Sequence, residues 1–111
     1  MSGFSNSTRG VFVGGSAGIG GEKRLEYITI ASLGNATNFG EILFGRNGGQ
    51  AACASATRGI YGGGSNAPSP IPHSSIEFII IANDGTNASL FGELLQPKQQ
   101  LAACSNAHGG I

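Results

Sequence analysis

The sequence predicts an all-β protein made of two tandem repeats of about fifty residues, each with four short strands. Residues 8–15 read TRGVFVGG, and residues 57–64 repeat this motif as TRGIYGGG. Other short apolar runs are rich in β-branched and aromatic residues and are bounded by turn-forming residues, which is typical of strands. The 20 glycines among 111 residues also count against long helices.

Four pairs of strands are expected, and the two members of each pair lie about fifty residues apart. They are residues 10–13 and 60–62, residues 25–31 and 76–82, residues 39–44 and 90–95, and residues 50–54 and 101–105. The last pair has mostly small side chains, which permit close packing. Helices over 40–44 and 93–100 are the competing interpretation, but the glycine content and Pro97 disfavour them.

Glycines end the repeated strand, at Gly14 and Gly15 in one copy and at residues 62–64 in the other. A glycine can take a positive φ and let the backbone pass close to a neighbouring strand. Flexible loop glycines are the alternative interpretation. The run at residues 14–21 superficially resembles a dinucleotide-binding loop, but no parallel βαβ unit and no acidic partner follow it, so nucleotide binding is not expected.

Residues 63–75 are expected to form the longest irregular and exposed segment. Its three prolines, Pro68, Pro70 and Pro72, lack a backbone donor and disfavour a central strand. We expect a partner-specific contact to use this loop. The residues expected to make it are Asn66, Ser69 and His73.

The order of features in one repeat resembles that of the kelch repeat. From Gln50 the sequence runs QAACAS, RGIYGGG, a variable loop, IEFIIIAN, and SLFGELL with one aromatic residue. Kelch repeats likewise have a strand ending in a glycine doublet, then a loop, a strand, and a last strand with an aromatic residue. That aromatic residue is usually Trp, which this chain lacks, so Phe39 and Phe91 would have to take its place.

The resemblance implies a fold more than an activity. It implies β-propeller blades, and the copies are most similar to the divergent, Gly- and Asn-rich blades of viral and bacterial surface proteins. Residues 1–50 would form the first blade, residues 51–100 the second, and residues 101–111 the start of a third, as a strand between subunits.

The two ends of the chain lie in the same phase of the repeat, so one strand is duplicated. Two blades cannot close a ring, and their outer faces would stay apolar and unpaired. We therefore expect copies of the chain to associate head to tail, into a ring if the rotation closes and into a fibre if it does not. The alternative is that the sequence is part of a longer array. The residues expected at the contact between copies are Ser2, Phe4, Val11, Val13, Leu101, Cys104 and Ile111.

The charge balance limits the classes of partner. Six basic side chains stand against six acidic ones, which gives no clustered positive charge for nucleic acid or an anionic membrane. No apolar run is long enough to span a bilayer. The start, MSGFSNSTRG, lacks the pattern of a signal peptide, so the chain stays where it is made or its export signal lies outside this sequence.

No catalytic, cofactor or metal site is expected. Cys53 and Cys104 occupy equivalent places, and two reduced core thiols are favoured over a disulfide. His73 has no partner at the spacing of a catalytic or metal motif. Two arginine–glutamate pairs recur in both copies and are expected to be structural contacts. They are Arg9 with Glu26 and Arg58 with Glu77.

Three asparagines, Asn6, Asn35 and Asn87, fit the N-glycosylation acceptor pattern. We interpret these tripeptides mainly as turns and as a minor indication of an extracellular surface. The predicted function is a structural or assembly protein of an extracellular or virion-associated fibre or ring. The alternative is an adhesin-like propeller that binds a glycan or protein through residues 14–23, 62–74 and 83–87, although the lack of Trp counts against a glycan site.

Overall fold

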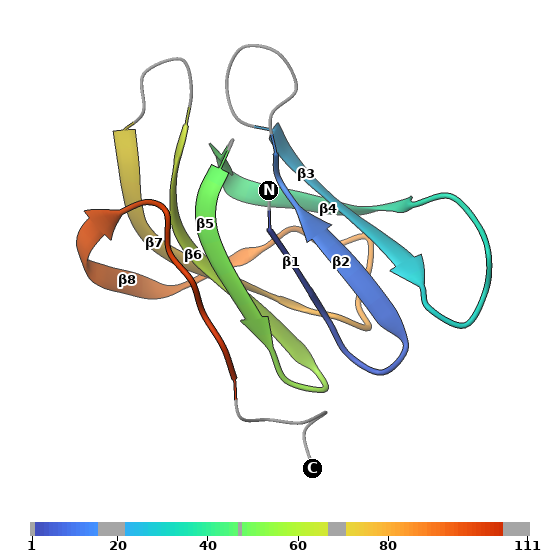
Figure 1. The fold of residues 1–111 in the computed structure, drawn as a ribbon. Helices are drawn as coiled ribbons and strands as arrows, with labels where there is room; N and C mark the ends of the chain where they lie inside the picture. Colours follow the sequence, from blue (N-terminus) through green and yellow to red (C-terminus); the bar gives the residue numbers. More distant parts are fainter. Residues whose placement is uncertain (1, 16–21, 47, 67–70, 106–111) are drawn as a thin grey trace.

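The fold consists of two four-stranded antiparallel sheets, in a computed structural model that describes residues 2–15, 22–46, 48–66 and 71–105 (Figure 1). There is no helix within these ranges. The prediction of an all-β chain is therefore confirmed, and each sheet has four strands, although the first of them, Ser2–Ser5, was not predicted.

Each sheet follows the order of the chain. The first sheet contains β1 (Ser2–Ser5), β2 (Arg9–Val13), β3 (Glu22–Thr29) and β4 (Thr37–Arg46) in the order β1-β2-β3-β4. The second sheet contains β5 (Gly48–Ala54), β6 (Arg58–Asn66), β7 (Ile71–Ile80) and β8 (Ser89–Lys98) in the order β5-β6-β7-β8.

The register of the first sheet is repeated in the second. Phe4 pairs with Val11 in β1 and β2, and its counterpart Cys53 pairs with Ile60 in β5 and β6. The third and fourth strands of both sheets share a register shift at the same place, directly before Glu26 in β3 and directly before Glu77 in β7. The sequence repeat is therefore a repeat of strand pairing, down to the position of this irregularity.

The last strand of each sheet is longer than predicted. Both β4 and β8 have ten residues, so the helical alternative over 40–44 and 93–100 is wrong. Pro97 is tolerated because β8 is an edge strand, where one side makes no ladder hydrogen bonds.

The predicted irregular segment over residues 63–75 is wrong at both of its ends. β6 continues to Asn66 and β7 begins at Ile71, and these two residues are paired, as are Ser65 and Pro72. Pro72 does not end the strand, because only one neighbouring strand, β6, pairs with β7 at this position. The pairing of β7 with β8 begins one residue later, at His73. Residues 67–70 lie outside the described part of the chain.

The predicted strand over residues 101–105 is not formed. Leu101 N donates a hydrogen bond to Gly49 O (3.0 Å), and Ser105 Oγ donates one to Ala54 O (2.9 Å). The segment thus lies beside β5 without forming a ladder, since the described part of the chain contains no third sheet for it to join.

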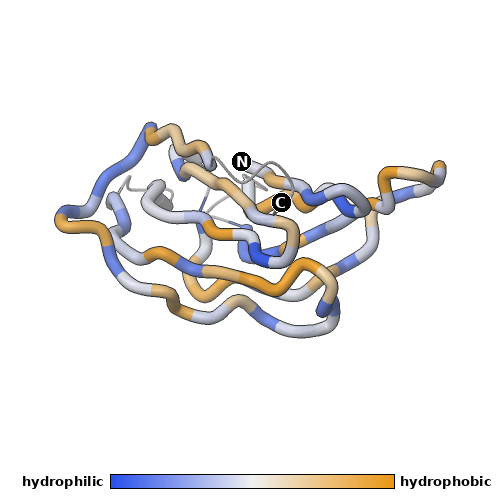
Figure 2. Tube along the Cα trace, turned by 90° about the horizontal axis from the view of Figure 1, so that it is seen from below, coloured by the Kyte–Doolittle hydropathy of each residue, from blue (hydrophilic) through white to orange (hydrophobic). Residues whose placement is uncertain are grey.

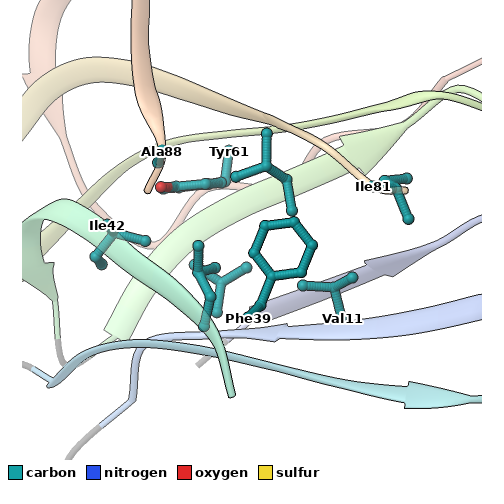
Figure 3. Packing of buried hydrophobic residues seen from close by; sticks show 9 residues of the cluster. Val11, Phe39, Ile42, Tyr61, Ile81 and Ala88 are labelled. Carbon is teal, nitrogen blue, oxygen red and sulfur yellow. The ribbon is translucent and has the colours of Figure 1, made fainter. Parts of the chain in front are cut away.

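The core lies between the two sheets (Figure 3). Its buried apolar side chains are Val11, Val13, Leu25, Phe39 and Ile42 from the first sheet and Tyr61, Ile79, Ile81 and Ala88 from the second sheet and the β7–β8 loop. The first strands of the two sheets, β1 and β5, lie side by side (Figure 1), and the Phe4 ring fills the space above Gly59, where a Cβ would overlap it. Asn6 Nδ2 also donates to Ala56 O across this contact (2.9 Å).

Gly40 is a point of close approach between the backbones of the two halves. A Cβ at this position would overlap the carbonyl oxygen of Thr86 in the β7–β8 loop. Gly40→Ala is therefore expected to lower the free energy of unfolding by about 1–3 kcal/mol, the usual cost of overpacking. Urea unfolding measures it, with Gly48→Ala as the control because nothing lies within 4 Å of a Cβ there. Equal losses in both variants would contradict the packing described.

Candidate functional site

The two sheets pack through opposite faces of the repeat. In the first sheet Val11 and Leu25 are buried against the second sheet. In the second sheet the corresponding positions, Ile60 and Ile76, point away from the core, while Tyr61 is buried in it. We call the two faces in contact the inner faces and the other two the outer faces. Each outer face is therefore the repeat equivalent of the opposite sheet's inner face.

A buried ion pair joins the inner faces. Arg46 Nη2, from the end of β4, contacts Glu77 Oε2 and Ser75 Oγ of β7. Glu77 Oε1 accepts hydrogen bonds from Leu43 N (2.7 Å) and from Tyr61 Oη (2.9 Å). Both charged side chains are fully buried (0% exposed), so the contact fixes the sheets in one register.

Burial and the neighbouring charges set the ionisation of this cluster. Burial lowers the pKa of Arg46, and Glu77 opposes that shift. Burial and the Glu77 carboxylate raise the pKa of Tyr61, which keeps the phenol protonated as a donor. Among the described residues, Arg46 Nε and Nη1 have no hydrogen-bond partner, so the cation depends on Glu77 for its compensation.

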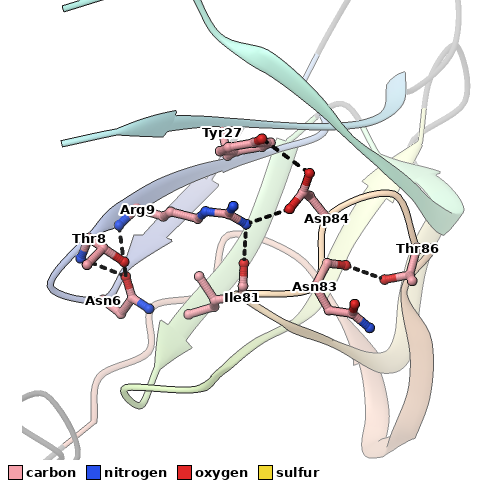
Figure 4. Close-up of polar contacts among 8 residues, drawn as sticks. All are labelled: Asn6, Thr8, Arg9, Tyr27, Ile81, Asn83, Asp84 and Thr86. Atoms are coloured by element: carbon pink, nitrogen blue, oxygen red, sulfur yellow. Dashed lines mark hydrogen bonds and ion pairs between the residues drawn. The ribbon is translucent and has the colours of Figure 1, made fainter. Parts of the chain in front are cut away.

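A second polar contact joins the sheets at the other end of the interface (Figure 4). Arg9 Nη1 lies 3.0 Å from Asp84 Oδ1 and donates to Ile81 O (2.8 Å). Tyr27 Oη donates to Asp84 Oδ2 (3.2 Å), and the guanidinium of Arg9 lies 4.4 Å from the centroid of the Tyr27 ring. The hydrogen bond from Arg9 is the main reason why the pKa of Asp84 lies below its usual value.

The predicted pairing of Arg9 with Glu26 and of Arg58 with Glu77 is wrong. Arg9 lies over Tyr27, the residue next to Glu26, and successive residues of a strand point to opposite faces. Arg58 likewise lies over the Phe78 ring, 4.9 Å from its centroid, next to Glu77. Each arginine is thus on the face opposite to the glutamate that was expected to bind it.

The β7–β8 loop packs onto β4. Gly85 N donates to Phe39 O (2.7 Å), Ala88 N donates to Glu41 O (2.9 Å), and Glu41 N donates to Asn87 Oδ1 (3.1 Å). Residues 83–87 were a predicted binding loop for an external partner. Two of their side chains, those of Asp84 and Asn87, make polar contacts with the first sheet, and all five residues are exposed.

The outer face of the second sheet is an exposed copy of the first sheet's inner face. Phe78 and Phe91 meet edge to face with centroids 5.9 Å apart and planes at 81°, as Tyr27 and Phe39 do at 6.0 Å and 89°. Phe39 is fully buried, whereas Phe91 is 51% exposed. The two phenylalanines expected to take the place of the missing Trp thus differ in burial, although the geometry of their aromatic pairs is the same.

The outer face of the first sheet is also apolar. Phe12 and Ile30 are 42% and 52% exposed, although their counterparts Tyr61 and Ile81 are buried. The β3–β4 loop, residues 30–36, is exposed throughout and projects away from the rest of the molecule (Figures 1 and 2). The apolar tip of this loop is Leu33, which is fully exposed.

Some residues predicted at the contact between copies lie in the core of the single chain. Val11 and Val13 are at most 1% exposed and pack against this chain's own second sheet. Phe4 is partly buried against the same core. The reason is that β2 is covered by the second sheet on the face that carries both valines, so the exposed side chain of β2 is Phe12.

The other predicted contact residues lie elsewhere. Ser2 is half-buried in β1, and Leu101 is half-buried over Gly63 on the outer face of the second sheet. Cys104 is exposed, so it is not a core thiol, while Cys53 is half-buried; neither cysteine forms a disulfide. Ile111 lies outside the described residues.

The predicted partner loop is divided between strands. Asn66 ends β6 and His73 belongs to β7, while Ser69 lies outside the described residues. The His73 ring stacks on Phe44 with centroids 5.7 Å apart. Burial and the positive charge of Arg46 lower the pKa of His73.

The three acceptor asparagines are turn residues in the structure. Asn6 Oδ1 accepts from the backbone of Thr8 (2.9 Å) and Arg9 (2.8 Å), which makes the β1–β2 turn. Asn87 Oδ1 binds β4, and Asn35 is exposed in the projecting loop. The interpretation of Asn6 as turn chemistry is confirmed.

A scan of the chain against protein-family models found no match, and a search of curated proteins found none either. In the described part of the chain, no group of three or more His, Cys, Asp or Glu side chains is placed to hold a metal ion. The same residues contain no helix that could cross a membrane.

Removing the buried carboxylate is expected to destabilise the chain. Glu77→Gln leaves the Arg46 charge buried without its counterion, which costs about 3–5 kcal/mol. The control is Glu26→Gln, the equivalent residue on the outer face, with an expected change within about 0.5 kcal/mol. Both are measured by urea unfolding. The double variant Arg46→Met, Glu77→Gln removes the cation and keeps a side-chain oxygen that can accept from Leu43 N and Tyr61 Oη, so it is expected to recover most of the loss. A loss as large as that of Glu77→Gln alone would contradict this account.

Proposed function

We propose that this chain is a non-catalytic structural protein, a self-associating β-repeat module whose copies join head to tail into a ring or fibre. The observation that supports it is the packing of unlike faces. The first sheet's inner face is the repeat equivalent of the second sheet's outer face, and the other two faces are equivalent in the same way. The internal contact uses one face of each kind, so every copy keeps one exposed apolar face of each kind at its two ends.

The two outer faces are complementary in type, so a contact between them is heterologous. Such a contact generates a closed ring or an open filament, depending on the rotation that it imposes. The kelch-like order of the strands supports blades of a propeller-like assembly. The side-by-side placement of β1 and β5, which would be the innermost strands of two neighbouring blades, also supports it (Figure 1). The exposed Phe12 and Phe91 are the large apolar side chains that such a contact would bury.

An extracellular or virion surface is the proposed location. The Gly- and Asn-rich composition, which is typical of the surface-protein repeats that this chain resembles, supports it. A module built from repeated scaffold contacts also fits a fibre better than an enzyme, because its two arginines over aromatic rings, Arg9 and Arg58, recur in both sheets as a packing device.

The proposal predicts that the intact chain is not a monomer in solution. Multi-angle light scattering is expected to give a mass that is a multiple of 11.1 kDa, or a distribution that grows with concentration. Negative-stain images of the same sample distinguish a ring from a fibre. A folded 11.1 kDa monomer across the accessible concentration range would overturn the proposal.

Residues 101–111 are predicted to contribute to the contact. Leu101 already occupies, over Gly63, the place that Gln50 at the start of the second sheet has over Gly14. The segment can therefore supply the innermost strand of the next copy's first sheet in exchange for that copy's β1. Deleting residues 101–111 is expected to abolish assembly in light scattering while circular dichroism stays β-type. If assembly is unchanged after the deletion, β1 of the next copy keeps its place in its own sheet and residues 101–111 do not contribute to the contact.

A further inference from the structure

We propose that the contact between copies repeats the internal contact residue by residue, and that Lys98 of one copy pairs with Glu26 of the next. This inference rests on the proposed function, because it specifies how one copy recognises another. The outer face of the second sheet of one copy would lie on the outer face of the first sheet of the next. The occupant of both apolar faces is therefore a second copy of this chain.

The charge pair follows from the alignment of strands. β4 and β8 have the same length, and Lys98 ends β8 as Arg46 ends β4. Arg46 lies opposite Glu22 in the ladder, and Lys98 lies opposite the equivalent residue, His73. On the other surface, Glu26 occupies in β3 the position that Glu77 has in β7, directly after the register shift.

The two surfaces are thus complementary in charge as well as in shape. The internal contact pairs a cation on the first sheet with a carboxylate on the second. The external surfaces present a cation, Lys98, and a carboxylate, Glu26, at the equivalent positions. Arg24 is a further cation near Glu26, at the place of Ser75, and its partner in the ladder is the acidic Glu41.

The apolar side chains match in the same way. Phe91 would be covered as Phe39 is covered, and Phe12 would be buried as Tyr61 is buried. Lys98 would lie near the Phe12 ring, as Arg46 lies 5.5 Å from the centroid of the Tyr61 ring. The large exposed aromatic groups of both faces are therefore removed from water by one contact.

The projecting β3–β4 loop has a defined role in this arrangement. It is the equivalent of the β7–β8 loop, which packs on β4, so in the assembly it would pack on β8 of the neighbouring copy. Asn35 and Ala36 correspond to Asn87 and Ala88. The expected hydrogen bonds are therefore from Ala36 N to Glu93 O and from Glu93 N to Asn35 Oδ1, which repeat those of Ala88 and Glu41.

This placement makes Gly92 a close-contact position. Gly92 is the counterpart of Gly40, and in the single chain nothing lies within 4 Å of a Cβ built on it. Against Gly40 lies the carbonyl of the residue before Asn87. Against Gly92 the corresponding carbonyl would be that of Gly34, the residue before Asn35 in the neighbour's loop.

The first test exchanges the two charges. Glu26→Lys and Lys98→Glu each place like charges at the contact, so each is expected to raise the concentration needed for assembly by roughly tenfold or more. Mixing the two single variants restores opposite charges at every contact and should restore assembly, as should the double variant. Light scattering and sedimentation velocity measure the association, and urea unfolding checks that each variant is folded.

The second test uses a methyl group. Gly92→Ala is expected to block assembly of a chain whose free energy of unfolding is unchanged when measured at a dilution where the intact chain is dissociated. Glycine-to-alanine substitution at Gly48, which is outside the predicted contact, serves as the control and should assemble normally.

The outcomes separate this inference from the proposed function. If the intact chain is a monomer, the proposed function fails and this inference fails with it. If the intact chain assembles but the charge variants and Gly92→Ala assemble equally well, the copies use another surface and this inference alone is overturned. Loss in the single variants with recovery on mixing supports the pairing of Lys98 with Glu26.

Discussion

The structure depends on one constraint, which is that a sheet of this repeat has apolar surface on both of its faces. Each face carries large apolar side chains, as shown by Leu25 and Ile28 on β3, which point to opposite sides. A single contact between two sheets covers one face of each and leaves the others exposed, including Phe12 on the first sheet and Phe91 on the second. A stack of two such sheets therefore leaves one apolar face uncovered at each end, and this exposure is the physical basis of the proposed association between copies.

The buried Arg46–Glu77 pair gives this otherwise apolar contact a unique register. Two apolar faces alone can slide or rotate at low cost, but displacing Arg46 from Glu77 would leave two unpaired charges in the interior. The hydrogen bonds from Tyr61 and Leu43 to the same carboxylate restrict it further. Burying the two charges has an energetic cost, and the pair restricts the sheets to a single alignment.

The sequence predicted most of the strands but not the faces that they bury. It did not predict β1, and the strand expected over residues 101–105 is not formed. The repeat of the glycine-ended strand predicts both sheets because strand pairing depends on local pattern and turn residues, as in the turn made by Asn6. Which face of each strand is buried depends on where the second sheet lies, and for that reason Val11 and Val13 were expected at an external contact although they form the core. Arg46 was not predicted to have a role, although the repeat has a basic residue, Lys98, at the equivalent position. Asp84 gave no such indication, since its counterpart in the other repeat is Leu33.

The differences between the internal and the external surfaces show how folding and association can be separated. The internal contact has the Arg9–Asp84 ion pair and the phenol groups of Tyr27 and Tyr61, each of which makes a hydrogen bond between or within the sheets. Their counterparts on the outer faces are Leu33, Phe78 and Phe12, which cannot make these bonds. The proposed external contact would therefore have the shape and the buried charge pair of the internal one with fewer polar contacts. Such a contact would be weaker than the internal one, whose two sheets belong to the same chain. Each chain would therefore fold around its own core before it bound a second copy. The copies would then associate in the same register as the two sheets inside one chain.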